Sequence, residues 1–339
     1  CLRSSGAAWE LSDIHMRTQS DPQLGATASY WSRKCARTWP ARATDNEHMI
    51  DDDDVPSLAL PKSPHWRALT AEATLASEQM ASGARGLGAL DPIRIGSFHT
   101  ALFSLSIGYE RMAKVALQID ARIETGNFLS EKEMRKRGHN IDTLLDHVEE
   151  MSIRRGYNTD PDCVRPKGDI TSAITGILTG FALKGRYNYL DSLGAPTAAP
   201  ADAEKQWDAD VMVPIAAAHL SDRQRLTLEA RAARARLLVD DMAKLSIGAL
   251  VRRQDVFGDV HTDLPSAMSR KQLYKLLIPY SRMYALQPAR WLAYILTALA
   301  QDSVGSSGAH GDVPDLSAFF RWMLQDDAYF RQRRDPGKG

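Results

Sequence analysis

Two charged residues in the longest apolar part of the sequence are the first candidates for chemistry. Glu110 and Lys114 lie four residues apart in the segment from Thr100 to Ile119, whose only other charged residue is Arg111. A Glu–Lys pair at this spacing supports a helix, but it leaves carboxylate lone pairs unfilled. Two interpretations stay open: a pair that only supports its own helix, and a Glu110 that also accepts a charge-assisted hydrogen bond from a neighbouring helix.

Arg186 is the candidate partner for Glu110. It lies in a predicted helix over 170–192, downstream of a stripe of small residues that indicates close packing against another helix. The stripe consists of Ser172, Gly176 and Gly180. Because the planar Arg group can bond both carboxylate oxygens, we expect Glu110 and Arg186 to form a buried or half-buried pair that joins two helices.

His139 is the third candidate, and it follows Gly138 at a break in the helical pattern. It could contact a nucleotide or RNA, but a structural histidine that bonds the backbone or a core polar group at a helix end is favoured. His147 lies eight residues further on, with Asp146 and Glu149 nearby. That spacing matches no known metal geometry, so we predict no metal and no other cofactor.

Three segments that hold these residues resemble the HEPN superfamily, the helical bundles named for nucleotide binding in higher eukaryotes and prokaryotes. They run from Tyr109 to Lys114, from Gly138 to Leu145 and from Gly185 to Asn188. The family has an early helix with Glu-x-x-x-Lys, a helix that opens on Gly-His, and a later helix with an Arg. The similarity covers about 93–193, close to a third of the chain. It implies an RNA, nucleotide or partner-protein site with the binding residues Glu110, Lys114, His139, Arg186 and Asn188.

The chain departs from the family's ribonucleases at the residues that catalyse. Those members carry an Arg and a His a few residues apart on a late helix, and they pair two such motifs across a dimer to act on the scissile phosphate and the 2′-hydroxyl. Here no His follows Arg186, and Asp191 is the nearest analogue. A carboxylate is a poor general acid unless its pKa is raised. We therefore predict no catalytic residues, with Arg186, Asp191 and His139 as the candidates for an active protein.

Other apparent motifs carry less information. The Arg-to-His spacing also occurs at Arg94…His99 and at Arg42…His48, about as often as chance predicts. Asp240-Asp241 lacks the remainder of an aspartate-rich diphosphate motif, and the sequence has no phosphate-binding glycine loop. The Arg residues of the segment 222–251 indicate a solvated helix face, with a stripe that faces RNA as the alternative.

Helices that position these residues are predicted along the chain from residue 66 to residue 333. Strict alternation over a strand length is absent, so the fold class is all-α, with a HEPN-like bundle over 60–195 and a second helical region over 204–333. A capping box is expected at Ser130–Glu133, a cap at Asp169, and a first-turn proline at Pro288. The predicted helices cover 66–85, 93–121, 131–153, 170–192, 222–251, 270–285, 288–302 and 315–333. A Pro/Ala linker is expected over 195–203, and a flexible loop over 303–313.

Composition excludes several classes of protein. The 339 residues hold 42 basic and 42 acidic side chains, so no global positive field indicates nucleic-acid binding. Three Cys exclude a disulfide scaffold, and no apolar run is long enough to span a membrane. We expect a cytoplasmic protein without a membrane partner. Residues 1–48 show no helical or strand period, so we expect a disordered or mis-assigned extension before a natural start at Met49.

The sequence thus favours a bacterial HEPN-like accessory or defence-type protein that binds RNA, a nucleotide or a partner protein without catalysis of its own. Related bundles occur in abortive-infection (phage-defence) and toxin–antitoxin proteins. A metal-independent ribonuclease toxin is the main alternative, and a helical interaction module without a ligand is the third. The family's habit of pairing implies a homodimer. Aromatic residues over 319–323 either complete the core or form an interface, and the core is favoured.

We predict that residues 1–48 are dispensable for folding. A chain that begins at Met49 should keep its helical circular dichroism and melt within about two degrees of the full chain, because the deleted segment has no period with which to pack. A loss of several degrees, equivalent to roughly 1 kcal/mol or more, would contradict this.

Overall fold

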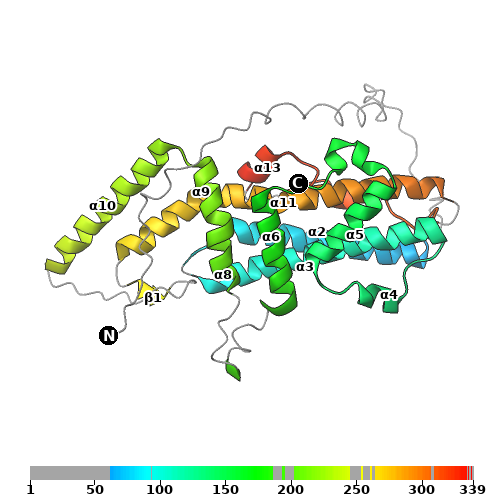
Figure 1. Cartoon of the computed structure of the whole chain (residues 1–339), viewed down its shortest axis with the longest axis horizontal. Coiled ribbons are helices and arrows are strands. Elements are labelled where there is room, and N and C mark those ends of the chain that lie inside the picture. The colour runs from blue at the N-terminus through cyan, green and yellow to red at the C-terminus, as the bar shows by residue number, and fades with distance from the viewer. Residues whose placement is uncertain are drawn as a thin grey trace, which may run out of the picture. The chain divides into compact units, whose positions relative to one another are not determined.

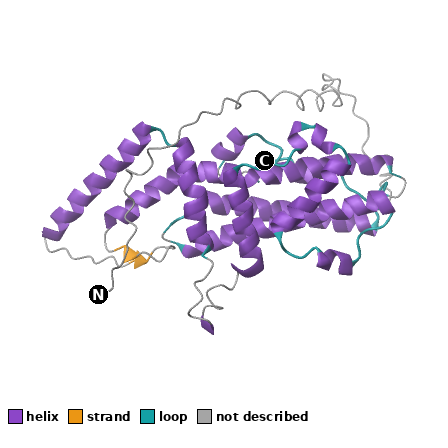
Figure 2. Cartoon of the chain, in the orientation of Figure 1, coloured by secondary structure: helices purple, strands orange, loops and turns teal. Residues whose placement is uncertain are grey.

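Helices account for most of the described chain, as Figures 1 and 2 show for this computed structural model. The structure describes residues 62–92, 94–185, 193–194, 202–244, 253–254, 260–261, 264–306, 309–333, 335 and 337. The predicted extension over 1–48 and Met49 lies outside them. A short antiparallel ladder joins β1 (Arg253–Gln254) to β2 (Val260–His261). The all-α prediction is confirmed.

The closest helix pair is α2 (Pro64–Gly88) with α3 (Ile95–Thr125). Glycines make this approach possible. A Cβ atom on Gly86 would lie 2.9 Å from the Cα of Ala101, and one on Gly108 would lie 2.5 Å from the sulfur of Met80. The sequence predicted that α2 stops before Gly86, but the helix continues through Gly88, and Gly86 packs against α3 instead of ending the helix.

A segment that is apolar on most faces, as from Thr100 to Ile119, predicts a central helix. This is confirmed, since α3 also packs on α5 (Ile141–Arg154), α6 (Asp169–Gly180) and α11 (Leu264–Gly305). One apolar seam of α3 is buried; it consists of Ala101, Leu105, Met112, Val115 and Ile119. A second seam consists of Phe103, Ile107 and Leu117. Phe103 is 44% exposed, so the second seam does not face the core along its whole length.

The predicted helix over 131–153 is two helices, α4 (Glu131–Lys136) and α5. The capping box is present: Glu133 N donates to Ser130 Oγ at 3.3 Å, and Ser130 N donates to Glu133 Oε2 at 2.8 Å. Gly138 then takes the left-handed conformation with φ of 67°. That conformation ends the regular spiral and starts α5 in a new direction.

The helix predicted over 170–192 differs from the structure in three ways. Asp169 lies in the first turn of α6 and Gly168 is its N-cap residue, so Asp169 is not the cap. The helix changes to a π-helical segment, Phe181–Gly185, at its end. Ser172, Gly176 and Gly180 are exposed, with nothing within 4 Å of a Cβ on either glycine. The expectation of tight packing through this stripe is wrong, and the buried face of α6 carries larger residues such as Ile174 and Leu178.

The 3-10 turns Tyr157–Thr159 and Pro161–Cys163 occupy the loop between α5 and α6. Burial raises the pKa of the free Cys163 thiol to about 12. The next elements are α8 (Ala203–Gln206), the π-helical segment Trp207–Met212, α9 (Val213–His219) and α10 (Asp222–Lys244). Ser221 caps α10 together with Gln224, whose backbone N donates to Ser221 Oγ at 3.3 Å.

The helices predicted over 270–285 and 288–302 are one continuous helix, α11. Pro279 and Pro288 lie inside it, so Pro288 is not a first-turn residue. A proline removes one helical hydrogen bond, but the residues beside it, including Leu286, Trp291 and Leu292, are buried. Tertiary packing along both halves therefore outweighs the local break.

The predicted last helix over 315–333 is two short helices, α12 (Ser317–Phe320) and α13 (Asp327–Gln332). Leu316, Phe320, Met323 and Phe330 are buried in the core, and Phe319 and Trp322 pack against it. The core interpretation of this aromatic segment is thus confirmed. Buried Arg282 holds the segment, because its Nε donates to Phe330 O at 2.7 Å and its Nη2 donates to Arg331 O at 2.9 Å.

The predicted flexible loop over 303–313 is partly anchored. Arg122 Nη2 donates to Asp312 Oδ2 at 2.6 Å, and Asp312 is only 8% exposed. Residues from α2 to α13 belong to one unit, Leu60–Gly339, with one continuous core. No helix in the described ranges is long and apolar enough to cross a bilayer.

We predict that Gly86→Ala lowers the free energy of unfolding by about 1–3 kcal/mol, because the new methyl meets the backbone of α3, which cannot move aside. Gly176→Ala is the matched control. Its site is open and helical, so the same change should stabilise by about 0.5–1 kcal/mol. Denaturant titration of both variants measures the difference, and equal effects would contradict the close-packing account.

Candidate functional site

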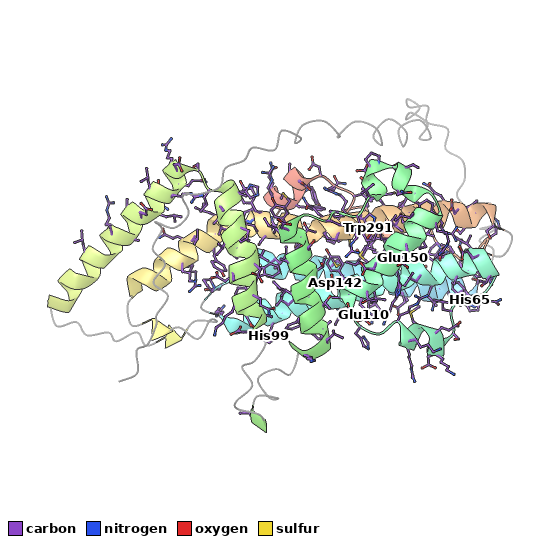
Figure 3. The ribbon with its side chains drawn as sticks, in the orientation of Figure 1. His65, His99, Glu110, Asp142, Glu150 and Trp291 are labelled. Atoms are coloured by element: carbon purple, nitrogen blue, oxygen red, sulfur yellow. The ribbon has the colours of Figure 1, made fainter. Side chains whose placement is uncertain are left out.

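Two of the predicted binding residues, Lys114 and His139, meet at the carboxylate of a third, Glu110. Lys114 Nζ lies 2.7 Å from Glu110 Oε1, and His139 Nδ1 lies 2.9 Å from the same oxygen. The Glu110 and Lys114 side chains are 15% and 20% exposed, whereas the His139 side chain is 65% exposed. We call these three residues the Glu110 cluster; Figure 3 labels Glu110 on α3. Glu110 pairs within its own helix, and its second partner is His139 in the connection between α4 and α5, not a residue of a neighbouring helix.

Local structure on both sides fixes the backbone of His139. Gly138 with its positive φ precedes it, and Asn140 follows as the N-cap of α5, with Thr143 N donating to Asn140 Oδ1 at 3.0 Å. Two residues after Asn140, Asp142 N donates to Thr179 Oγ1 at 3.0 Å, which ties the start of α5 to α6. His139 therefore projects from a short connection that two helices hold in place.

The carboxylate determines which imidazole nitrogen carries the proton. An ionised carboxylate only accepts hydrogen bonds, so Nδ1 of His139 must donate to Glu110. In the neutral ring Nε2 is then an acceptor, and no hydrogen bond to Nε2 occurs among the described residues. The arrangement presents an oriented, exposed imidazole that can stack on a base, bind a donor or, when protonated, bond a phosphate oxygen.

Basic side chains adjoin His139 in the sequence. The α4 segment has four basic side chains and two acidic ones, an excess of two positive charges. The basic residues are Lys132, Arg135, Lys136 and Arg137, and the acidic residues are Glu131 and Glu133. The i,i+4 pair between Arg135 Nη2 and Glu131 Oε1, at 2.5 Å, is about four-fifths exposed and is already included in this excess. The surface that leads to His139 is thus locally basic on a chain with no net charge.

Arg186, Asn188 and Asp191 lie outside the described residues, and so does the expected pair between Glu110 and Arg186. The structure therefore brings together Glu110, Lys114 and His139 of the predicted set. His147 is a different case, since its Nδ1 is buried without a hydrogen bond. No group of three His, Cys, Asp or Glu side chains in the described ranges could hold a metal ion.

Sequence reasoning missed a second titratable group on α3. His99 Nε2 lies 2.9 Å from Glu204 Oε1, where the Glu204 side chain is 2% exposed and that of His99 29% exposed. The Phe181 ring packs edge-on against His99 at 5.4 Å between ring centroids. Asp202, the N-cap of α8, shares a hydrogen bond with Glu204. Figure 3 labels His99 on α3.

The electrostatics of this group follow from two carboxyls in a confined site. Burial, with the neighbouring Glu204, raises the pKa of Asp202, so Asp202 more readily holds a shared proton. Burial alone would raise the pKa of Glu204, but the hydrogen bond from His99 holds it below the ordinary value. That same bond to Glu204 raises the pKa of His99. The result is a buried ion pair that joins α3 to α8.

The sequence held only weak signals for this group. The Arg94…His99 spacing drew attention to His99 but pointed to the wrong partner, and Glu204 follows directly on the predicted Pro/Ala linker. No helical period places Glu204 opposite α3. Only the tertiary fold does so.

Comparison with known proteins gives no match, whether to a family model, to a curated protein or to a solved structure. The HEPN resemblance thus rests on the motif residues alone.

We predict that the His99–Glu204 pair stabilises the fold most in mildly acidic solution. The folded pKa of His99 is raised above its ordinary value of 6.5, so the contribution of the pair is full just below that pH and is lost as the pH rises through the folded pKa. It is also lost in stronger acid, as Glu204, whose folded pKa lies below its ordinary value of 4.5, takes up a proton. In denaturant titrations, His99→Gln should therefore lower the free energy of unfolding by less at a pH above the folded pKa of His99 than at a pH just below 6.5. In a Glu204→Gln background the same change should show no such trend, and a constant loss in both backgrounds would contradict the pairing.

Proposed function

We propose that the chain is a helical RNA-binding protein without catalysis of its own, which binds single-stranded RNA at the Glu110 cluster. The observation that carries the proposal is the exposed His139 ring, held by Glu110 beside Lys114. Single-stranded RNA is recognised by stacking on aromatic or imidazole rings and by cations near the phosphates. The cluster offers one of each.

The basic α4 segment supports the proposal. Phosphate contacts supply most non-specific affinity for nucleic acid, and Lys132, Lys136 and Arg137 form no ion pair among the described residues. They are therefore available to phosphates without breaking a bond of the fold. The HEPN resemblance points to the same ligand class, and a bacterial accessory or defence role follows from that resemblance.

A ribonuclease is the second candidate, because the cluster contains an exposed His–Glu pair. A carboxylate that orients a histidine and leaves its other nitrogen open is the arrangement of a general base. Cleavage next to a 2′-hydroxyl also needs a group that stabilises the phosphate, for which Lys114 is adjacent and Arg186 is the family's residue. The missing family His after Arg186 places binding first.

We predict that His139→Ala weakens binding of a fluorescent single-stranded RNA oligonucleotide roughly tenfold, since loss of stacking costs about 1–3 kcal/mol per base. Lys114→Ala should remove about one phosphate contact, so the slope of the logarithm of the binding constant against the logarithm of the salt concentration should become less steep by about 0.7. His310→Ala and Lys275→Ala remove the same residue types at other exposed positions and should bind like the wild type.

The same samples test catalysis. RNA incubated with the wild type in chelator should stay intact, whereas cleavage that disappears in His139→Ala would establish the ribonuclease instead. If the wild type neither binds nor cleaves RNA, both candidates are wrong.

A further inference from the structure

The long helix α10 packs against the rest of the unit on one side only. Arg225, Leu228 and Ala232 are its half-buried positions, spaced three and four residues apart. Arg225 Nη2 donates to Ala216 O of α9 at 3.2 Å, and α11 is the helix that packs along α10. Figure 1 shows α10 beside the first part of α11. No residue of α10 whose side chain is described is fully buried. Within the described ranges, the opposite face is therefore exposed.

That open face carries an apolar seam. Its members are Leu226, Ala230, Ala233 and Leu237, spaced four, three and four residues apart. The two leucines are 64% and 65% exposed. This spacing keeps the four side chains on one narrow stripe of a helix, and it is the repeat with which one helix packs along another. We call these four residues the α10 seam.

Opposite charges stand on the two sides of the seam. With 100° per residue, Glu229 lies on one edge of the stripe and Arg234 on the other. Both are exposed, and neither forms an ion pair among the described residues. Arg231 lies well away from the seam on the same helix, and it is exposed as well.

We propose that the α10 seam binds the α10 seam of a second copy of this chain, with the two helices parallel about a two-fold axis. In a parallel helix pair, a residue that directly precedes a core position, as Glu229 precedes Ala230, faces the residue of the partner helix whose number is five higher. That rule places Glu229 of each copy against Arg234 of the other. In an antiparallel pair, Arg234 of one copy would lie beside Arg234 of the other, and Glu229 beside Glu229.

The composition of the face decides between a second copy and nucleic acid. Phosphates would use the arginines but gain nothing from two exposed leucines, and Glu229 would repel them. A copy of the same helix uses every one of these features. The seam is short and half of it is Ala, so it buries less than the roughly 1,600 Å² of a standard interface, and the dimer is weak and concentration-dependent.

Sedimentation velocity over a range of concentrations tests the proposal. The wild type should shift from monomer to dimer as its concentration rises, and Leu226→Glu and Leu237→Glu should remain monomers. Arg231→Glu, the matched control off the seam, should dimerise like the wild type. Circular dichroism checks that each variant keeps its fold, which is expected because none of these side chains is buried.

Charge exchange tests the parallel register. Glu229→Arg alone and Arg234→Glu alone should each be monomeric, because each places like charges across both sides of the dimer. A mixture of the two should form a heterodimer, since every cross-pair is then Glu against Arg. A monomeric wild type at every concentration, a dimer that survives Leu226→Glu, or a mixture that stays monomeric would each overturn the proposal. RNA binding that Arg231→Glu and Arg234→Glu weaken alike, with no dimer, would assign the face to RNA.

Discussion

The close approach of α2 and α3 is the constraint on which the rest of the structure depends. Gly83, Gly86 and Gly108 leave no room for a side chain between the two helices, so their backbones pack directly together. This contact buries one side of α3 along its length. Because α5, α6 and α11 then cover other sides, α3 becomes the element against which both titratable groups are built.

A central helix can carry charge only where a partner satisfies that charge. Glu110 and Lys114 satisfy each other, and His139 completes the set from outside the helix. His99, nearer the start of α3, meets a fully buried carboxylate instead. The same helix therefore carries a cluster with an exposed ring, suited to a ligand, and a buried ion pair that holds α8 in place.

Features that depend on neighbouring residues could be predicted from the sequence, whereas contacts between distant segments could not. The Ser130–Glu133 capping box, the central role of α3 and the buried aromatic segment near the C-terminus all depend on residues close together in the chain, and all are confirmed. Gly86 and the stripe at Gly176 were interpreted in the reverse of their true roles, because a glycine's sequence context does not show which helix lies against it. The prediction that Pro288 starts a helix is wrong for a related reason, since the buried residues on both sides of it outweigh the local break. For the site, the Glu110–Lys114 pair was predictable, whereas the bond from His139 needed the turn at Gly138.

The central claim is that Glu110 fixes the tautomer and direction of His139. Nitrogen-detected NMR of the histidine rings tests it directly. The account predicts that the neutral ring of His139 carries its proton on Nδ1, that Glu110→Gln abolishes this preference, and that a single-stranded RNA oligonucleotide shifts the Nε2 signal. A ring protonated mainly on Nε2, with the same spectrum in Glu110→Gln, would contradict it.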